Sequence, residues 1–406
     1  MNEEQEAILA KVKKGHNVLI TGGAGTGKSY LLGHIAGALT HKVTSLAAMT
    51  GAAAVLVNGS TLHSALSLGL AKGSPQEIAN KISKNRRWSA YYHILELEVL
   101  MVDEVSMLND VLFDKVSKVL QILRRNSNEF GGIQLVLVGD LFQLPPVEGR
   151  YCFQSPLWDK CNFEIYELTK NMRQKDDEPF MEMLKRLRLG RCSRADLETL
   201  HSLKETQFPE GIEPTTLYCK NIDVDAINTR ELLNLHKELR VYSVCYSGSR
   251  ESSERYAKTS NVPETVSLCI GAQVMITYNI DLARQLVNGT RGVVTGMSET
   301  GVTMRLLDGR EELITFIRIQ NEDDPDIDFH YLPVRLAWAV TIHKSQGLTL
   351  DAIEIDIGSN IFSVGQAYTA LSRARNLKSV RIRDVLARSF CASQDVKEFL
   401  LKYAKP

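Results

Sequence analysis

The sequence lacks paired cysteines, and this absence excludes the usual structural zinc sites. Its seven cysteines lie far apart, and none of them forms a CxxC pair. Zinc ribbons and related folds need such pairs, so no structural zinc is expected. The odd number and wide spacing are typical of reduced thiols, which predicts an intracellular compartment such as the nucleus, the cytoplasm or an organelle matrix. The cysteines occupy positions 152, 161, 192, 219, 245, 269 and 391.

Long apolar runs and an excess of one charge are also missing. The longest weakly polar stretch, residues 46–57, spans about 12 residues, whereas a membrane helix needs roughly 20. The N-terminal MNEEQEAILA is acidic and lacks the basic start and apolar run of a signal peptide. Lysine plus arginine equals aspartate plus glutamate at 48 each, so the net charge indicates no partner. We therefore expect a monomer without a membrane partner, and any nucleic-acid site must be a local basic surface.

What the sequence does contain is an alternation of strand-like and helix-like segments. With 406 residues the chain is long enough for two or three domains. Between residues 17 and 147, near-continuous apolar runs such as LEVLMVDE and QLVLVGD alternate with helical patterns, which predicts a parallel sheet covered on both faces. Residues 173–236 read as helical with one strand, and residues 240–334 as short strands with glycine turns. The acidic stretch at 321–328 is expected to be a solvated turn. The fold class is therefore α/β with an inserted all-β module.

The segment from Gly22 to Ser29, GGAGTGKS, matches the pattern GxxxxGK[ST] between a strand and a helix. Glycines let backbone N–H groups surround a phosphate, Lys28 reaches the terminal phosphates, and the Ser29 hydroxyl can hold magnesium. The alternative is a chance glycine turn, which would match in roughly 1–2% of chains of this length. The strand–loop–helix context favours nucleotide binding, with Gly22, Gly23, Ala24, Gly25, Thr26, Gly27, Lys28 and Ser29 as the expected contacts.

Acidic and amide side chains follow two further strands. Asp103 and Glu104 end the run VLMVDE, where Asp103 would complete the magnesium site and Glu104 would activate water. The alternative for this pair is helix capping. Gln143 lies just past the strand LVLVGD, and its neutral amide can contact a γ-phosphate or orient the attacking water. Pro145 and Pro146 would stiffen the chain beyond it. The alternative for Gln143 is an ordinary polar residue of a turn.

Together these segments resemble superfamily-one DNA helicases. The motifs VDEVSML, GDLFQLPPV, LTKNMRQ, TIHKSQGLTL and QAYTALSRAR follow the P-loop in the order found in that superfamily. The match is closest to the Pif-type (petite integration frequency) family, with RecD-like helicases next. EVSMLNDVLFDKVSKVLQILR is similar to the Pif-type signature, and GAQVMITYN with LVNGTRGVV resembles the inserted β-barrel of that family. The resemblance covers the chain from Gln5 to about Asn376.

The resemblance implies two RecA-like parallel-sheet P-loop domains. The first would be residues 1–172, with a wedge-like helical insertion at 66–93. The second would be residues 173–236 plus 335–406, and 237–334 would form a small barrel like that of Src-homology-three domains. Lys81, Lys84, Arg86 and Arg87 lie in the wedge-like insertion, where the alternative is a solvated helix face.

The resemblance also implies how ATP is bound. Gln5 would read adenine, because a carboxamide pairs with both N6 and N7 of that base. Arg173 and Arg373 would be the arginine fingers that neutralise charge in the transition state. Either arginine taken alone would more simply be a surface or salt-bridged residue. Gly347 would let the backbone approach the nucleotide closely.

Single-stranded DNA is the partner that the resemblance implies. Hydroxyl groups and backbone N–H groups suit phosphates, and a histidine ring can stack on a base or donate to a phosphate. A lone histidine would otherwise be a structural one. The sequence departs from the family at Ala65, where an aromatic residue is usual, and Phe142 or Trp88 could take over its stacking role. The implied contacts are Thr50, Gly51, Thr61, His63 and Ser64 in the first domain, and Thr341, His343 and Lys344 in the second.

The function implied is that of an ATP- and Mg²⁺-dependent DNA helicase that moves 5′ to 3′ and opens duplex junctions. Family members act in replication, repair, recombination and telomere maintenance, and on G-quadruplexes and RNA–DNA hybrids. The residues quoted above favour none of these roles over the others. Two alternatives stay open. One is a translocase that strips proteins from DNA and unwinds weakly, which the Ala65 departure favours. The other is a DNA-docking subunit of a larger complex, which the presence of Glu104 and Gln143 disfavours.

Overall fold

The computed structural model divides the chain into two compact units. The first unit comprises Met1–Arg191, Ser363–Gly365 and Cys391–Pro406, and the second comprises Cys192–Phe362 and Gln366–Phe390. In the described part of the chain, no helix is long and apolar enough to cross a membrane. The residues that the structure describes are 1–84, 88–170, 177–208, 213–219, 224–259, 262–281, 284–320 and 326–405.

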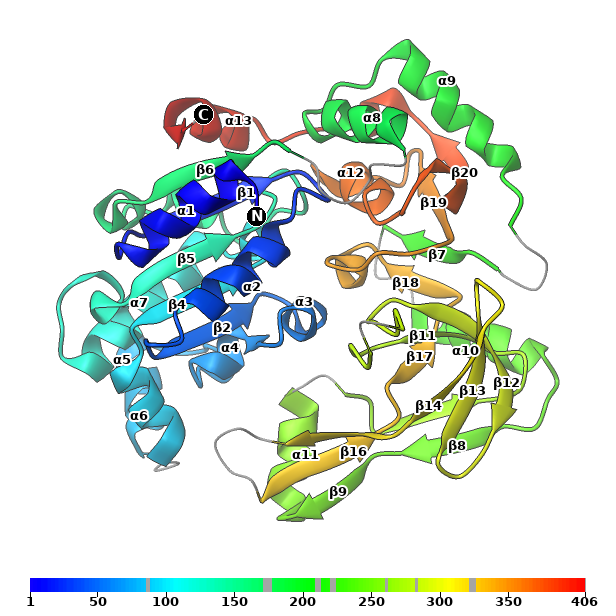
Figure 1. Ribbon diagram of the computed structural model, residues 1–406, viewed down its shortest axis with the longest axis horizontal. Coiled ribbons are helices and arrows are strands. Elements are labelled where there is room, and N and C mark those ends of the chain that lie inside the picture. The colour runs from blue at the N-terminus through cyan, green and yellow to red at the C-terminus, as the bar shows by residue number, and fades with distance from the viewer. Residues whose placement is uncertain are drawn as a thin grey trace. The chain divides into compact units, whose positions relative to one another are not determined.

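A seven-stranded parallel sheet forms the centre of the first unit (Figure 1). Its strand order is β21-β6-β1-β5-β4-β2-β3, so the strands that carry the P-loop, the acidic pair and Gln143 are neighbours. This confirms the parallel sheet predicted for residues 17–147. The strands are β1 (Val18–Gly22), β2 (Thr44–Ala48), β3 (Ser60–Thr61), β4 (Val99–Asp103), β5 (Gln134–Val138), β6 (Glu164–Leu168) and β21 (Ala404–Lys405).

Helices cover both faces of this sheet because alternate strand residues point to opposite sides. Ile20 and Val136 pack with α1 (Glu3–Lys13) and α2 (Lys28–Ala38) on one face. Leu19 packs on the other face in a core that includes side chains from the helices listed next. These are α5 (Pro75–Lys84), α7 (Asp110–Arg124) and α13 (Gln394–Tyr403). The C-terminal segment therefore returns to the first unit, where β21 extends the sheet beside β6.

The predicted helical stretch at 66–93 is helical at 75–84 and 88–93, whereas residues 66–74 form turns and 85–87 lie outside the described residues. Helix α5 occupies part of it, and α6 (Trp88–Glu96) begins within it. Ile78 and Ile82 of α5 are buried in the same core as α7, whereas Lys81 and Lys84 are exposed. Arg86 and Arg87 lie outside the described residues, as does the side chain of Trp88. The first unit also contains α3 (Gly51–Leu56), α4 (Leu62–Ala65) and α8 (Glu178–Arg188).

A second parallel sheet, in the order β18-β7-β19-β20, lies in the second unit. Register pairs such as Leu217↔Val340 and Leu217↔Ile355 place β7 between its two neighbours. Its strands are β7 (Thr215–Tyr218), β18 (Ala339–Thr341), β19 (Ile353–Ile357) and β20 (Val380–Val385). Helices α9 (Arg194–Ser202), α10 (Val224–Asn234) and α12 (Gln366–Leu371) belong to this unit.

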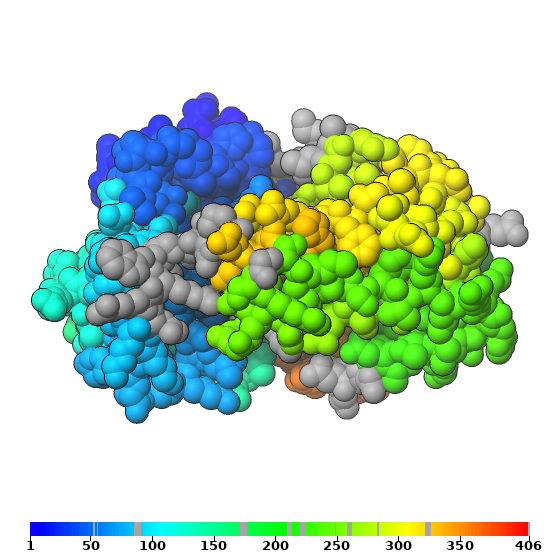
Figure 2. Space-filling view, turned by 90° about the horizontal axis from the view of Figure 1, so that it is seen from below, coloured from blue at the N-terminus to red at the C-terminus, as the bar shows by residue number. Residues whose placement is uncertain are grey.

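Between β7 and β18 the chain forms antiparallel sheets, and residues near 240 and near 300 belong to one continuous surface in Figure 2. One sheet contains β14 (Glu311–Thr315), β13 (Gly301–Leu306), β12 (Arg291–Met297), β11 (Gln273–Ile276) and β17 (Val334–Leu336). Another contains β15 (Ile317–Gln320), β16 (Ile327–Tyr331) and β9 (Cys245–Gly248). A third pairs β10 (Thr265–Leu268) with β8 (Arg240–Ser243), and α11 (Arg250–Thr259) is the helix of this region.

Three features of this insertion differ from the prediction. Helix α11 interrupts the expected run of strands. The segment EELITFIRI is divided at Phe316 between two sheets. The predicted turn at 321–328 ends in strand β16, because Ile327 and Phe329 are buried and the Asp328 carboxylate pairs with Arg318. Residues 321–325 of that stretch lie outside the described residues.

Candidate nucleotide site and nucleic-acid residues

The carboxyl ends of β1, β5 and β4 meet at one edge of the first sheet. The P-loop follows β1, Asp103 ends β4, and Gln143 follows β5 by a few residues. Ligands of open parallel sheets bind at such an edge. The structure therefore brings together the three groups of residues that the sequence predicted for the first domain.

The P-loop curls because two of its glycines adopt left-handed backbone conformations. Gly25 has φ = 78° and Gly27 has φ = 83°, values that other residues rarely adopt. Gly27 is the N-terminal flanking residue of α2 and makes no side-chain cap there. The first N–H groups of α2 are thus left open for an anion, which a phosphate at a helix N-terminus would satisfy.

Lys28 folds back over the loop. Its Nζ donates hydrogen bonds to the carbonyl oxygens of Gly22 and Gly23, at 2.8 and 2.9 Å. Burial lowers the pKa of Lys28, an effect that the nearby Asp140 and Glu104 carboxylates oppose. The ammonium therefore points into the loop that would hold the phosphates.

Asp103 is the most perturbed carboxylate of the site. Its Oδ2 accepts a hydrogen bond from Ser29 Oγ at 3.1 Å, and its Oδ1 accepts one from the Glu104 N–H at 2.8 Å. Burial, together with the neighbouring Glu104 charge, raises the pKa of Asp103 to about 7. Glu104 has φ = 55°, an unusual left-handed conformation for a residue with a side chain. Such strain is common at functional sites, where the surrounding fold maintains it.

The raised pKa of Asp103 predicts a pH-dependent gain of stability on substitution. Above its ordinary value of 3.8, the unfolded chain releases the proton while the folded protein keeps it up to about pH 7. Asp103 therefore lowers stability progressively as the pH rises through this window. We expect Asp103→Asn to raise the melting temperature of the nucleotide-free protein more at pH 8 than at pH 5, as measured by circular dichroism.

The exposed Asp159 provides the matched control for this substitution. Asp159→Asn makes the same change of side chain at an exposed position, and the gain at pH 8 over pH 5 for Asp103→Asn is measured relative to it. An equal gain at pH 5 and pH 8 for Asp103→Asn would contradict the inferred burial of a charged carboxylate.

Gln143 is buried, with 4% of its surface exposed. Its backbone N–H donates to the Asp140 carbonyl at 3.0 Å, which closes a tight turn after β5. Among the described residues, no group hydrogen-bonds to its side-chain Oε1. A buried amide oxygen without a protein partner is costly, so a donor from a ligand or a water fits this position.

Asp140 connects this turn to helix α8. The Nε of Arg188, the last residue of α8, donates to Asp140 Oδ1 at 2.9 Å, and its Nη1 donates to Glu167 at 2.6 Å. The guanidinium also lies over the Phe142 ring, 4.7 Å from its centroid. Sequence reasoning missed Arg188, because a single arginine at the end of an amphipathic helix has no distinguishing spacing.

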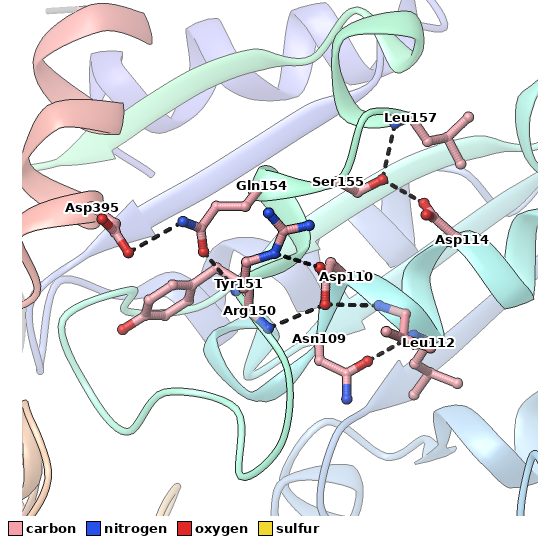
Figure 3. Close-up of polar contacts among 11 residues, drawn as sticks. Asn109, Asp110, Leu112, Asp114, Arg150, Tyr151, Gln154, Ser155, Leu157 and Asp395 are labelled. Atoms are coloured by element: carbon pink, nitrogen blue, oxygen red, sulfur yellow. Dashed lines mark hydrogen bonds and ion pairs between the residues drawn. The ribbon is translucent and has the colours of Figure 1, made fainter.

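The segment after Gln143 is anchored to helix α7, which belongs to the signature stretch (Figure 3). Asp110 accepts hydrogen bonds from the backbone N–H and the Nε of Arg150, at 3.1 and 2.9 Å. Its own N–H donates to the Arg150 carbonyl at 3.0 Å. Gln154 then donates to Asp395 of α13 at 3.2 Å. The backbone that carries Gln143 is thus held at Asp140 and again at Arg150.

Gln5 is completely buried near the N-terminus of α1. Its Oε1 accepts from the Asn2 N–H at 3.2 Å and its N–H donates to the Asn2 side chain at 2.9 Å, which forms a capping box. Within the described residues, its side-chain Nε2 has no hydrogen-bond acceptor. The structure therefore gives Gln5 a structural role and leaves one donor for a further partner.

The DNA residues expected in the first unit lie just after β2, and at the end of β3 and just after it. Thr50 accepts from the Ala53 N–H at 3.2 Å. Thr61 caps α4 by accepting from the Ser64 N–H at 3.3 Å, and its hydroxyl donates to Ser64 Oγ at 3.0 Å. His63 is half-buried, and burial lowers its pKa, which favours the neutral ring.

The residues expected in the second unit lie at the end of β18 and just after it. Thr341 is buried and accepts from the Lys344 N–H at 3.2 Å, whereas the Lys344 side chain is exposed. His343 is half-buried, and burial lowers its pKa as it does for His63. Gly347 has φ = 84°, so a side chain at this position would strain the turn.

The two predicted arginine fingers have different outcomes. Arg373 is buried, and its guanidinium donates to the carbonyls of Thr369 and Leu348 and to Ser372 Oγ, at 3.0, 3.4 and 2.9 Å. These contacts hold it at the end of α12 within the second unit. Arg173 lies outside the described residues.

Comparison with known proteins identifies relatives along the whole chain. The family model described as PIF1-like helicase matches residues 1–198, and that of the 2B domain of the DNA helicase Pif1 matches residues 257–297. The ATP-dependent DNA helicase PIF1 of Xenopus laevis is 38% identical over 420 residues, which cover 98% of this chain. The alignment covers 64% of the frog protein, so the chain spans less than two thirds of that relative.

Solved structures agree with these matches. The crystal structure of Pif1 helicase from Candida albicans is 33% identical, with a TM-score of 0.81 and 99% of both chains covered. The structure of Pif1 helicase from Bacteroides in complex with ADP-AlF3 and single-stranded DNA is 27% identical, with a TM-score of 0.70, and covers 100% of this chain and 99% of that chain. Sequence and fold therefore lead to the same assignment, and the chain belongs to the PIF1-like helicase family.

Proposed function

We propose that the chain is an ATP-dependent DNA helicase that moves 5′ to 3′ along single-stranded DNA and opens duplex junctions. The observation that carries the proposal is the edge of the first sheet, where the P-loop with Lys28 and Ser29 lies beside Asp103 and the strained Glu104. The relative from Bacteroides binds both ADP-AlF3 and single-stranded DNA, which supports the same ligands here. The proposal includes G-quadruplexes and RNA–DNA hybrids as further substrates, and the genome-maintenance pathways of the family as the setting in which the helicase acts.

The P-loop and Lys28 would hold the phosphates of ATP, and Gln5 would contact adenine through its remaining donor. Ser29 Oγ and Asp103 Oδ2 lie 3.1 Å apart, and this hydroxyl–carboxylate pair fits the oxygen ligands that Mg²⁺ prefers. When bound, Mg²⁺ would neutralise phosphate charge. Glu104 would accept the proton of the attacking water, and the buried Gln143 amide would orient that water or contact the γ-phosphate.

The arginine fingers and the domain limits complete the proposed motor. Arg373, and Arg173 outside the described residues, would neutralise charge on the transferring phosphoryl group. Residues 1–172 would form the first RecA-like domain, and residues 173–236 with 335–406 the second, whereas the compact first unit also includes the residues up to Arg191 and those from Cys391 onward. The antiparallel sheets of 237–334 would be the small barrel, and the segment 66–93 the wedge beside the duplex junction. The exposed Lys81 and Lys84 suit a surface that faces phosphates.

DNA would lie along the loops that follow β2, β3 and β18. The backbone at Gly51 and the hydroxyl groups of Thr50, Thr61, Ser64 and Thr341 suit phosphate contacts, as does the exposed Lys344. His63 and His343, whose lowered pKa values favour neutral rings, suit base stacking or a hydrogen bond more than charge pairing.

A second candidate function is a translocase that displaces proteins from DNA and unwinds weakly. Leu66, beside the Ala65 departure, is 1% exposed, and Phe142 is 3% exposed in the same core. Neither side chain is free to stack on a base, so the usual aromatic contact has no replacement from these two residues. Fewer stacking contacts would weaken the grip on the strand while duplex is opened.

The two functions are separated by measuring ATP hydrolysis with and without single-stranded DNA, and then strand separation on duplexes with a 5′ or a 3′ tail. The helicase is supported if DNA stimulates hydrolysis and only the 5′-tailed duplex is opened. Stimulation without opening of either duplex would support the translocase. Hydrolysis that does not respond to DNA would overturn both.

A further inference from the structure

Gly365 lies directly against the backbone that carries Gln143. A Cβ atom at Gly365 would be 2.4 Å from the Gln143 carbonyl oxygen and 2.5 Å from that of Phe142. Gly365 also has φ = 72°, a left-handed conformation that disfavours side chains. Only glycine therefore allows this approach, in which the chain touches the turn after β5 at the residue proposed to sense the γ-phosphate.

Gly365 is held to the first unit by a second contact. Its N–H donates to the Cys391 carbonyl at 2.9 Å. The short segment Ser363–Gly365 and the segment from Cys391 onward are both parts of the first unit, although the residues before and between them belong to the second. At this point, therefore, three consecutive residues belong to the first unit, and the residues on either side of them belong to the second.

The next residue, Gln366, is anchored in the second unit. It is completely buried, its Nε2 donates to the Cys219 carbonyl at 2.8 Å, and its Oε1 accepts from the Phe362 N–H at 3.1 Å. Gln366 begins α12, in which every residue is buried. That helix leads to Arg373, whose Nε donates back to the Thr369 carbonyl at 3.0 Å.

From these contacts we infer that the chain at Gly365–Gln366 is a hinge. Through it, contact of Gln143 with the γ-phosphate would change the position of α12 and Arg373. The inference rests on the proposed ATPase function and adds a route of regulation to the same site. Two consecutive residues are anchored in different units, so the torsion angles between them must absorb any motion of α12 relative to Gln143. Gly365 is a positioning residue in this scheme, because it acts through Gln143 and Arg373 and touches no nucleotide.

The test compares Gly365→Ala with Gly309→Ala. Gly309 has φ = 86° and open space around its α-carbon, so alanine there carries the same backbone cost without the clash. We expect Gly365→Ala to lower the kcat of DNA-stimulated ATP hydrolysis by about 10- to 100-fold, as misplaced catalytic groups do. KM for ATP should change by less than about threefold, because the P-loop is untouched. Gly309→Ala should retain the wild-type kcat.

A second readout distinguishes the hinge from a loss of packing. The affinity for a labelled oligo-dT strand is measured with ADP and with ADP-AlF4. In the wild type it should differ between the two nucleotides, and in Gly365→Ala this difference should disappear. The double variant Gln143→Ala/Gly365→Ala should lose no more activity than the more impaired single variant, because both act on one route. If the two losses in kcat multiply instead, the hinge is refuted.

Gln366→Met serves if Gly365→Ala does not fold. It removes the hydrogen bond to Cys219 from the other side of the hinge and introduces no clash at Gln143. The same loss of nucleotide-dependent DNA affinity supports the hinge, and an unchanged nucleotide response overturns it. A wild-type protein without DNA-stimulated hydrolysis would refute the proposed function itself. Failure of the hinge alone would appear as an active wild type and a Gly365→Ala variant with wild-type kcat and nucleotide response.

Discussion

Replacement of Lys28 by alanine should abolish ATP hydrolysis, with kcat reduced by about 100-fold or more. The Lys28 ammonium lies over the P-loop, where its Nζ is within 2.9 Å of two loop carbonyls. Removing a positioned charge that stabilises a phosphoryl-transfer transition state typically costs about 10²–10³ in rate. DNA binding should be largely retained, since the residues proposed to contact DNA follow other strands. Steady-state hydrolysis and equilibrium binding of a labelled strand measure the two effects.

The control is Lys14→Ala, which removes an exposed lysine outside the P-loop. It should leave both hydrolysis and DNA binding at wild-type levels. Lys28→Arg adds a second comparison, because it keeps the charge and changes the shape of the donor. Retained hydrolysis in Lys28→Ala would refute the assignment of the P-loop.

The placement of the P-loop, Asp103 and Gln143 at one edge of the sheet was predictable because the information for it is local. The P-loop, Asp103 and Gln143 each follow an apolar run, and parallel strands bring their carboxyl ends to one edge whatever the loops between them. The order of the motifs also predicted the second parallel sheet. The few residues at the end of a parallel strand determine the turn that follows, and they always lie at the carboxyl edge of the sheet.

Features that depend on distant segments were not predicted. Arg188 reaches Asp140 and Glu167 from the end of α8, and no sequence pattern links these three residues. Strand β21 joins the first sheet from the other end of the chain. The segment EELITFIRI reads as one strand, yet its halves belong to different sheets because each half has its own pairing partners. Gly365 is similar, since its close approach to Gln143 is visible only in the folded chain.

Replacement of Glu104 by glutamine should separate hydrolysis from nucleotide binding. Glutamine keeps the size of the side chain and the backbone N–H that donates to Asp103 at 2.8 Å, but it cannot accept a proton from water. Loss of a general base typically costs about 10²–10⁴ in rate. We therefore expect kcat to fall by at least about 100-fold, with the affinity for ADP, measured by calorimetry in the presence of Mg²⁺, equal to or tighter than that of the wild type.

The tighter binding has a specific cause. The Glu104 charge is one reason why the pKa of Asp103 is raised to about 7. Glu104→Gln removes that charge, so Asp103 loses its proton at lower pH and is a better Mg²⁺ ligand near neutrality. Glu98→Gln, which replaces an exposed glutamate before β4, should leave hydrolysis and ADP affinity unchanged. If Glu104→Gln lowers ADP affinity and hydrolysis by the same factor, Glu104 helps to hold the nucleotide, and another group must activate the water.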